Sequence, residues 1–228
     1  MPSEPTNRPR FLKGALVVYE SQSPGPPPKV IVFQYNPEQM KRSLEKRAVE
    51  SKGGGGSAPS KEDLLRAAGP PAESINLQIA LDAADQLAEA DRSAVENGLF
   101  PVLSVLEMLL YPPTSRVQQI EAAAGQGEVQ VSPADLPLVL LVWGQSRVVP
   151  VMLTSFAISE ESFDVKLNPI RVKVDLAMKV LTYLELKKDT VGYDAYLSYQ
   201  RRKEQHAASY NAGAGEAAVM QTVNQSRR

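Results

Sequence analysis

The chain has 228 residues, enough for one domain of ordinary size with appendages. Its 25 basic and 26 acidic side chains give a net charge of -1, which provides no general electrostatic attraction to nucleic acid or to anionic lipid. The absence of cysteine excludes disulfides and thiolate metal sites, and no run of about 18 apolar residues could span a bilayer, so we expect a soluble, cytoplasmic protein.

The N-terminal part predicts an arm followed by two strands. Residues 1–10 are polar and rich in proline, which is typical of a flexible arm. Residues 16–19 form a short apolar strand, and the proline run at 24–28 predicts a stiff hairpin connection. Residues 30–35 then return as a β-branched and aromatic strand that ends at an Asn-Pro step, which favours a turn.

The segment after Pro37 predicts an exposed edge strand. Basic residues discourage unwanted pairing at a sheet edge, and they leave the strand free to pair with a chosen neighbour. Those residues are Lys41, Arg42, Lys46 and Arg47. We therefore consider this edge an assembly surface.

A flexible insertion is predicted at about residues 51–72. Residues 53–57 read Gly-Gly-Gly-Gly-Ser, the composition of a flexible linker, and Ser60 can cap a short helix that runs to about Ala68. No Gly-Lys-Ser/Thr follows the glycines, so we reject a phosphate-binding loop.

Strand and helix patterns alternate through the middle of the chain. Residues 74–82 alternate between apolar and polar side chains, which predicts a strand with one buried face, and an acidic loop follows at 82–97. Leucines at helical spacing predict a helix over 99–110, which Tyr111-Pro112-Pro113 ends. Residues 114–135 lack periodicity and predict a surface loop, with a short helix near 117–123.

The second half predicts a run of strands. Three are expected at residues 138–143, at 146–156 with Pro150 marking a bulge or an edge, and at 157–166. The longest strand covers about 171–184 and alternates strictly between apolar and polar side chains, so one face should meet the core and the other water or a partner. Residues 188–228 predict a helix with a mobile tail.

We find no residue set that supports catalysis, a metal or a cofactor. The single histidine, His206, lies in a polar segment and fits a solvated side chain. The pair Glu160-Glu161 fits a hairpin turn, because neighbouring strand residues point to opposite faces and cannot converge on a substrate. Trp143 fits a core or subunit-interface anchor. We therefore do not expect an enzyme.

The ordered set of these segments resembles the tube-protein family of contractile injection systems, the phage-tail-like machines, and especially the domain that begins the inner tube at the baseplate. The resemblance covers about residues 11–187. The similar pieces are Val30 to Glu38, the strand at Ser74 to Asp82 with its acidic loop, the helix that ends at Tyr111-Pro112-Pro113, Pro137 to Gly144, and Leu167 to Glu185.

The resemblance implies an antiparallel α+β barrel or sandwich with one packed amphipathic helix. It also implies a ring, usually six-fold, that joins the spike to the inner tube and contacts sheath or baseplate proteins. Subunits should meet at element ends, so the candidate interface residues are Phe33, Tyr35, Asn36, Pro37, Glu38, Trp143, Asn168 and Pro169. We expect the protein to act within an assembled particle, without a cofactor.

The C-terminal segment departs from the family pattern. Many relatives continue into a LysM module, whereas residues 188–228 are too short and too rich in Ala and Gln for one. This segment could instead clamp a neighbouring sheath or baseplate subunit, or dock on its own domain, and the sequence leaves both open. The candidate clamp residues are Tyr193, Tyr196, Tyr199, Arg201 and Arg202.

Two other functions stay open. One is an inner-tube layer or a cap-side adaptor of the same fold, which the sequence does not separate from a baseplate adaptor. The other is a stand-alone binding module whose partner docks on the edge near residues 42–47. A binding module should be monomeric when purified alone, whereas a ring protein should oligomerise or need a stacking partner.

Overall fold

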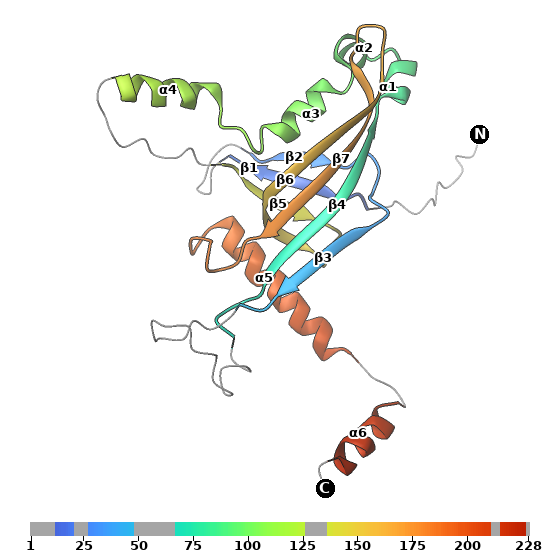
Figure 1. Cartoon of the computed structure of the whole chain (residues 1–228), viewed down its shortest axis with the longest axis vertical. Helices are drawn as coiled ribbons and strands as arrows, with labels where there is room; N and C mark the ends of the chain where they lie inside the picture. The colour runs from blue at the N-terminus through green and yellow to red at the C-terminus, as the bar shows by residue number, and fades with distance from the viewer. Residues whose placement is uncertain (1–11, 21–26, 48–66, 126–135, 211–214, 227–228) are drawn as a thin grey trace, which may run out of the picture.

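The computed structural model describes residues 12–20, 27–47, 67–125, 136–210 and 215–226. Its centre is one seven-stranded antiparallel sheet with the strand order β2-β1-β5-β6-β7-β4-β3 (Figure 1). The strands are β1 (Ala15–Tyr19), β2 (Lys29–Val32), β3 (Met40–Glu45), β4 (Ala72–Asp82), β5 (Leu138–Val142), β6 (Val148–Phe163) and β7 (Pro169–Val180). With the helices that pack on this sheet, the expected antiparallel α+β class is confirmed.

The long strand β7 divides its side chains between two faces. Successive strand residues point to opposite faces, so alternation in sequence becomes one apolar and one polar face. The inward residues Val172, Val174, Leu176, Met178 and Val180 are buried, while Arg171, Lys173 and Asp175 are exposed. The alternation predicted for this strand is confirmed, although the strand ends at Val180.

The core joins the sheet to two helices. Leu103 and Leu106 of α3 (Phe100–Glu107) and Tyr196 and Tyr199 of α5 (Val191–Ala208) belong to the same buried cluster as the inward side chains of β7. Full burial of one such leucine contributes about 2 kcal/mol. The core therefore includes side chains that follow residue 188.

The segment after β4 contains two short helices, and the expected acidic loop at 82–97 was wrong. They are α1 (Ala84–Ala88) and α2 (Arg92–Asn97). Asp91 is the N-cap of α2, and its carboxylate accepts from the Ala94 N–H at 2.9 Å. The Asp82 carboxylate, two residues before α1, accepts from the N–H of the first helical residue, Ala84, at 2.8 Å.

Strand β6 is continuous where we expected two strands and a turn. Glu160 and Glu161 lie inside β6, and a shift in register between Glu160 and Ser162 leaves Glu161 as a bulge residue. The Glu161 carboxylate contacts Lys173 Nζ at 2.5 Å across the strands. The predicted turn at this acidic pair was therefore wrong, and the chain turns at residues 164–168 instead.

Pro150 also lies inside β6, on neither an edge nor a bulge. It faces Leu140 of β5, and the pairing with β7 begins only at Val151. The Pro150 carbonyl accepts from the Leu181 N–H at 2.9 Å. Its missing N–H therefore leaves the β6–β7 ladder intact, and the irregularity lies at residues 153–155.

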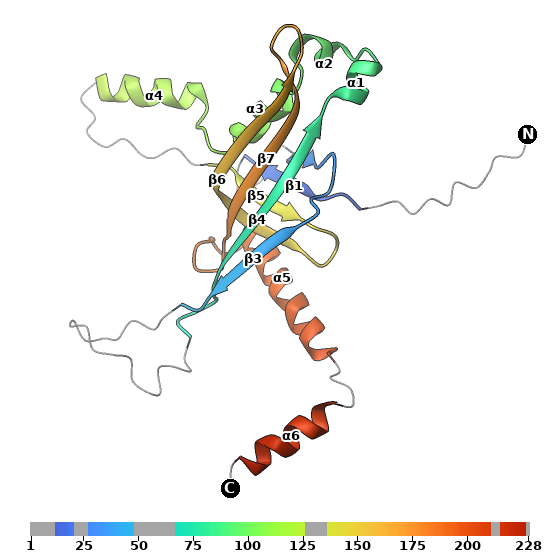
Figure 2. The same cartoon turned by 45° about the vertical axis from the view of Figure 1, so that its right-hand side comes forward.

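Two helices project from the sheet in both Figure 1 and Figure 2. α4 (Thr114–Gly125) is longer than the helix expected near 117–123, and α6 (Gly215–Gln225) lies where a tail was expected. The arm at 1–10, the glycine linker at 53–57 and the helix from Ser60 lie outside the described residues. Among the described helices, none combines the length and the apolar character needed to cross a membrane.

The sheet curls, and side chains bridge between distant strands. Arg147, after β5, donates from Nη1 to the sulfur of Met40 in β3 at 3.1 Å. Gln34, after β2, bonds to the main chain of Asp82 at the end of β4. In the described part of the chain β2 and β3 do not pair with each other, so the sheet stays open.

Candidate functional site

The edge strand β2 presents an apolar surface and free main-chain groups. Its Val30 and Val32 side chains are 58% and 54% exposed. The Phe33 N–H donates to the Gly14 carbonyl at 2.8 Å, and bonded pairs alternate along an antiparallel ladder. The N–H and C=O groups of Val30 and Val32 therefore point to the open side, where no strand of the described chain lies.

The opposite edge, β3, is polar, and its basic side chains contact other elements of the chain. Arg42 Nη2 lies 2.5 Å from a carboxylate oxygen of Glu73, and Arg47 Nη2 lies 2.6 Å from Glu185. β3 is an edge strand as predicted. Arg42 and Arg47, however, attach this edge to the domain beneath it.

Phe33 is a core residue. It is 1% exposed, and its ring centroid lies 6.5 Å from that of Trp143, which is partly buried against the same cluster. A Cβ at Gly14 would lie 2.7 Å from both rings, so this glycine lets the two rings approach the backbone of the chain. Phe33 and Trp143 thus pack against each other at the end of β2 on the core side, which is an intramolecular role.

Two amide side chains of the predicted motif pair with main chain. Gln34 donates from Nε2 to the Asp82 carbonyl at 2.7 Å, and its Oε1 accepts from the Asp82 N–H at 2.8 Å. Asn36 donates from Nδ2 to the Leu12 carbonyl at 2.9 Å and accepts from the Gly14 N–H at 2.8 Å. Each amide therefore takes the place that a peptide group of a strand would occupy.

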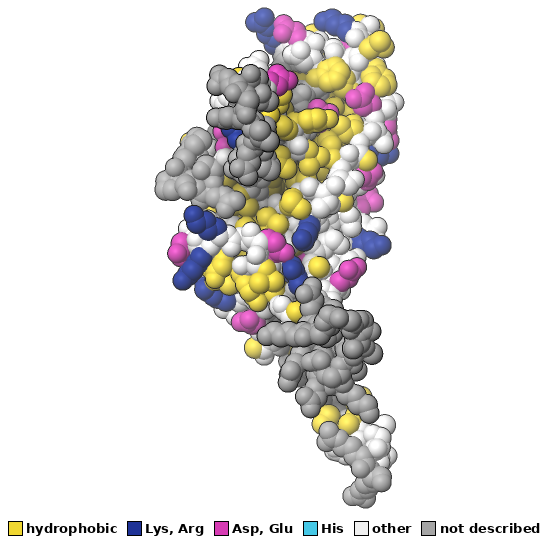
Figure 3. Space-filling model, turned by 60° about the vertical axis from the view of Figure 1, so that its left-hand side comes forward, with side chains coloured by type: hydrophobic (Ala, Val, Ile, Leu, Met, Phe, Trp, Pro, Cys, Tyr) yellow, Lys and Arg dark blue, Asp and Glu magenta, His cyan; other side chains and the backbone are white. Residues whose placement is uncertain are grey.

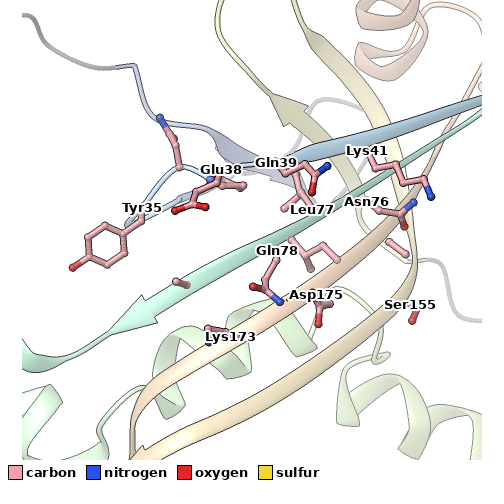
Figure 4. Close-up of a pocket in the computed structure, with 15 residues that line it drawn as sticks. Tyr35, Glu38, Gln39, Lys41, Asn76, Leu77, Gln78, Ser155, Lys173 and Asp175 are labelled. Carbon is pink, nitrogen blue, oxygen red and sulfur yellow. Dashed lines mark hydrogen bonds between the residues drawn. The ribbon is translucent and has the colours of Figure 1, made fainter.

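The rest of the motif forms one wall of a polar trough of about 740 Å³. In Figure 4, Tyr35 and Glu38 lie at one end of this wall and Gln39 and Lys41 further along it. The floor is the polar face of the sheet, to which β4 contributes Asn76 and Gln78, β7 contributes Lys173 and Asp175, and β6 contributes Ser155. Gln78 donates from Nε2 to Asp175 at 2.9 Å. Tyr35, Asn36, Pro37 and Glu38 are thus brought together around one hollow.

Asn168 and Pro169 lie at the turn between β6 and β7 and bind elements of the same chain. Asn168 donates from Nδ2 to Asp164 at 2.9 Å. Desolvation would raise the pKa of Asp164, but hydrogen bonds from the Asn168 N–H, the Asn168 side chain and the Lys166 N–H outweigh it and lower the pKa. The Pro169 carbonyl accepts from the Leu99 N–H at 2.8 Å. Gly98 has φ +55°, and a Cβ there would lie 2.5 Å from that carbonyl. The turn thus holds the start of α3.

A buried ionic cluster joins β3 and β4 to α5. Glu73 is 4% exposed and receives Arg42 at 2.5 Å, Lys203 Nζ at 3.1 Å and the Tyr199 hydroxyl at 3.1 Å. Burial alone would raise the pKa of Glu73, but the hydrogen bond from Arg42 and the charge of Lys203 outweigh it and lower the pKa. Lys203 also lies 3.9 Å from the ring centre of Tyr199.

The tyrosines of α5 dock on their own domain. Tyr196 packs edge-on against Tyr183, with centroids 6.1 Å apart, and burial raises the pKa of Tyr199 to about 12. The sequence left open whether these tyrosines clamp a neighbouring subunit or dock on their own domain. Tyr196 and Tyr199 are buried in the core of their own domain, and Tyr193 is half-buried. Arg201 and Arg202 are exposed and stay candidate partner contacts.

A second ionic group lies beside the first. Thr182 donates from its N–H to Glu185 at 2.9 Å, and its hydroxyl also bonds to that carboxylate. Burial would raise the pKa of Glu185, but the hydrogen bonds from Arg47 and Thr182 outweigh it and lower the pKa to about 2. Glu185 therefore stays ionised at neutral pH and holds the end of β3 against the segment after β7.

Exposed apolar side chains also gather on one face. Figure 3 shows a band of hydrophobic side chains on the side that lies to the left in Figure 1. A hollow of about 550 Å³ between β1 and α3 is lined by Val18, Val105 and Met108. Patches of this kind mark contact surfaces, but nothing in the described residues shows what covers this one.

Within the described ranges, no group of three or more His, Asp or Glu side chains is arranged to hold a metal ion. The candidate site is thus a set of contact surfaces: the β2 edge, the polar trough and the exposed part of α5. Sequence reasoning missed Glu73 and Gln34. A glutamate at an inward position of an alternating strand was the available signal for Glu73, and Gln34 gave none.

Comparisons with known proteins identify no family. No family model matches the chain, and no curated protein matches it. A similar solved structure is a chain of the tail of an empty GTA particle, determined with helical refinement in C6 symmetry. It is 13% identical, the match covers 73% of this chain and 90% of that chain, and the TM-score is 0.28. A TM-score this low does not establish a shared fold, and the family of this chain is not shown.

Proposed function

We propose that the chain is a non-enzymatic structural subunit of a phage-tail-like contractile injection particle. In this proposal copies of the chain form a six-fold ring that joins the baseplate spike to the inner tube. The ordered sequence resemblance over residues 11–187 supports the family, and an antiparallel sheet with two free edges supports the ring.

The open sheet carries the proposal. Its edges are chemically different, with exposed Val30 and Val32 on β2 and a polar strand at β3. Pairing β2 of one copy with β3 of the next is a head-to-tail contact, and such contacts generate a ring when the rotation closes. Closure would also remove two free edges, which are otherwise prone to unwanted pairing.

The faces of β7 fit the same assembly. The apolar face is already buried in the subunit, so the exposed face with Arg171, Lys173 and Asp175 remains for solvent. In a ring that continues the sheet from copy to copy, this polar face would line a wet channel. Spike, tube, sheath and baseplate proteins are then the partners, and no nucleic acid or membrane is needed.

The C-terminal part of the proposal concerns α5 and α6. Arg201 and Arg202 lie beyond the buried Tyr199, on the stretch of α5 that carries exposed side chains. We place the contact with a sheath or baseplate subunit there. Deleting residues 209–228 and exchanging both arginines for glutamine would test it, whereas a deletion from residue 189 would also remove Tyr196 and Tyr199 from the core.

The mass of the purified chain tests the ring. We expect light scattering after size-exclusion chromatography to give a mass near six copies at high protein concentration, or after addition of a stacking partner. Images of whole particles with a labelled subunit would then give its position, because a baseplate adaptor appears at the spike end and a tube layer appears along the shaft. A chain that stays monomeric at every concentration and with every particle component would contradict the ring and favour a binding module.

A further inference from the structure

We propose that the polar trough is a binding site for an extended, proline-rich peptide, and that its occupant is the chain's own N-terminal segment, residues 1–11. This site is formed within one subunit and does not depend on the ring.

Several polar side chains of the trough have hydrogen-bonding groups that no described residue of the chain satisfies. Within the described residues, the side chains of Gln39 and Asn76 have no hydrogen-bond partner. Gln78 uses its Nε2 on Asp175, which leaves its Oε1 available. A hollow of about 740 Å³ lies within the size range of ligand sites, and the amide groups along its wall and floor can both donate to and accept from a peptide main chain.

This chain already pairs amide side chains with main chain twice. Gln34 pairs with both the N–H and the C=O of Asp82, and Asn36 pairs with the Gly14 N–H and the Leu12 carbonyl. Gln39 and Asn76 offer the same groups to a further stretch of backbone. An extended peptide is therefore a better match for the trough than a compact ligand.

The first eleven residues have the matching chemistry. They contain three prolines, and a proline-rich segment adopts the polyproline II conformation, which has no internal hydrogen bonds and presents its carbonyls outward. Those carbonyls can accept from the Gln39 and Asn76 amides and from the Tyr35 hydroxyl. Aromatic rings such as Tyr35, which is 50% exposed, are typical walls for polyproline segments.

The attachment point lies at the rim of the trough. The Leu12 carbonyl is bonded to Asn36, and Asn36 is one of the residues that line the hollow. Eleven residues in polyproline II conformation span about 34 Å, which exceeds the width of the three floor strands at their spacing of about 4.8 Å. The segment can therefore reach across the whole trough from its own attachment.

The charged residues of the N-terminal segment and those of the trough wall follow complementary orders. Arg10 and Arg8 are nearest to Leu12 in sequence, and Glu38 lies near Asn36 in the wall. Glu4 is further from Leu12, and Lys41 lies further along the wall (Figure 4). Lys173 is already paired with Glu161 at 2.5 Å, so Lys41 is the cation of the trough that Glu4 can meet. In this proposal the segment then crosses from the β3 wall over β4 and β7, along the row in which Lys41, Asn76, Ala177 and Ser155 are paired neighbours, and this path places Ser3 beside Ser155.

Cysteine pairs test the site, because the natural chain has no cysteine. One variant carries Ser3→Cys with Ser155→Cys, and its control carries Ser3→Cys with Ser159→Cys. Both partner serines are exposed residues of β6, but only Ser155 lines the trough. With dilute protein in oxidised glutathione, we expect the first variant to form an intrachain disulfide about ten-fold faster or more.

A charge exchange sharpens the result. Arg8→Glu or Glu38→Arg alone should slow the cross-link at Ser155, and the two together should restore it. Equal rates at Ser155 and Ser159, or disulfides that join two chains at low concentration, would overturn the proposal. Because the measurement uses dilute single chains with unchanged circular dichroism, its failure would not bear on the ring.

Discussion

The two edge strands of the sheet differ in how the rest of the chain holds them. β3 is braced by the chain itself, because Arg42 reaches the buried Glu73 and Arg47 reaches Glu185. β2 has no such attachment on its open side within the described residues, and Val30 and Val32 are exposed there. One edge is thus braced by ion pairs within the subunit, whereas the other has outward main-chain groups with no partner in the described residues.

Loss of Glu73 should have the largest effect on the braced edge. Glu73→Ala leaves Arg42 and Lys203 without their shared carboxylate, and breaking a buried ion pair by removing one partner costs about 3 kcal/mol or more. Urea unfolding would measure it. Glu161→Ala is the control, because its pair with Lys173 is exposed and should be worth less than about 1 kcal/mol. Equal losses in both variants would contradict the role given to Glu73.

The support beneath the free edge can be tested at Gly14. Gly14→Ala puts a Cβ 2.7 Å from the rings of Phe33 and Trp143, so the packing must shift at a cost of about 2 kcal/mol. Gly144→Ala meets no atom within 4 Å and carries only the strain of φ +67°, about 1 kcal/mol. Thermal unfolding of the two variants compares them, and a larger loss at Gly144 would show that the Gly14 contact is not tight.

Removal of the Tyr199 hydroxyl should weaken the ionic cluster around Glu73 modestly. Tyr199→Phe removes the hydroxyl that donates to Glu73 and accepts from Arg42, while the ring beneath Lys203 remains. We expect a loss of about 1 kcal/mol in the free energy of unfolding. Tyr210→Phe, at a ring that is 78% exposed, should change nothing measurable, and a loss there equal to that at Tyr199 would be evidence against the buried cluster.

Acid should weaken the contacts of Glu185 that hold the end of β3. The folded-state pKa of Glu185 is about 2, below its ordinary value of 4.5, so its contribution is present above pH 4.5 and is lost as the pH falls toward 2. The melting temperature should therefore fall over this range, and it should fall less steeply in Glu185→Gln. Identical pH profiles for the two proteins would show that ionised Glu185 does not stabilise the end of β3.

Most of the fold could be predicted because it follows from periodicity. The alternation in β7 and the leucine spacing in α3 each reflect one buried face, and Asn168-Pro169 marks the start of β7. The strand expected over 30–35, however, ends at Val32, and Asn36-Pro37 lies in the connection between β2 and β3. The acidic pair in β6 misled us because a bulge lets Glu161 bond to Lys173, a contact between positions twelve residues apart. The segment after β4 likewise misled us, because its acidic composition suggested a loop, whereas the Asp82 and Asp91 carboxylates accept from N–H groups in the first turns of α1 and α2.

The candidate site was only partly predictable. The sequence placed Tyr35 to Glu38 at a strand end, but it could not show that Phe33 packs inward on Trp143 or that Asn168 binds the α2–α3 segment. Those contacts depend on how the sheet curls. The Glu73 cluster joins residues up to 130 positions apart, and single-sequence patterns do not report such distances.

Pairing at the β2 edge is tested most directly by Val30→Pro. Proline removes the outward N–H of Val30 without removing an N–H that faces β1, whereas Val30→Thr keeps that donor. If β2 joins the next copy, sedimentation velocity should find the natural chain and the Val30→Thr chain in rings, and the Val30→Pro chain as a folded monomer. Rings of unchanged mass in Val30→Pro, with β2 still folded, would contradict assembly through this edge.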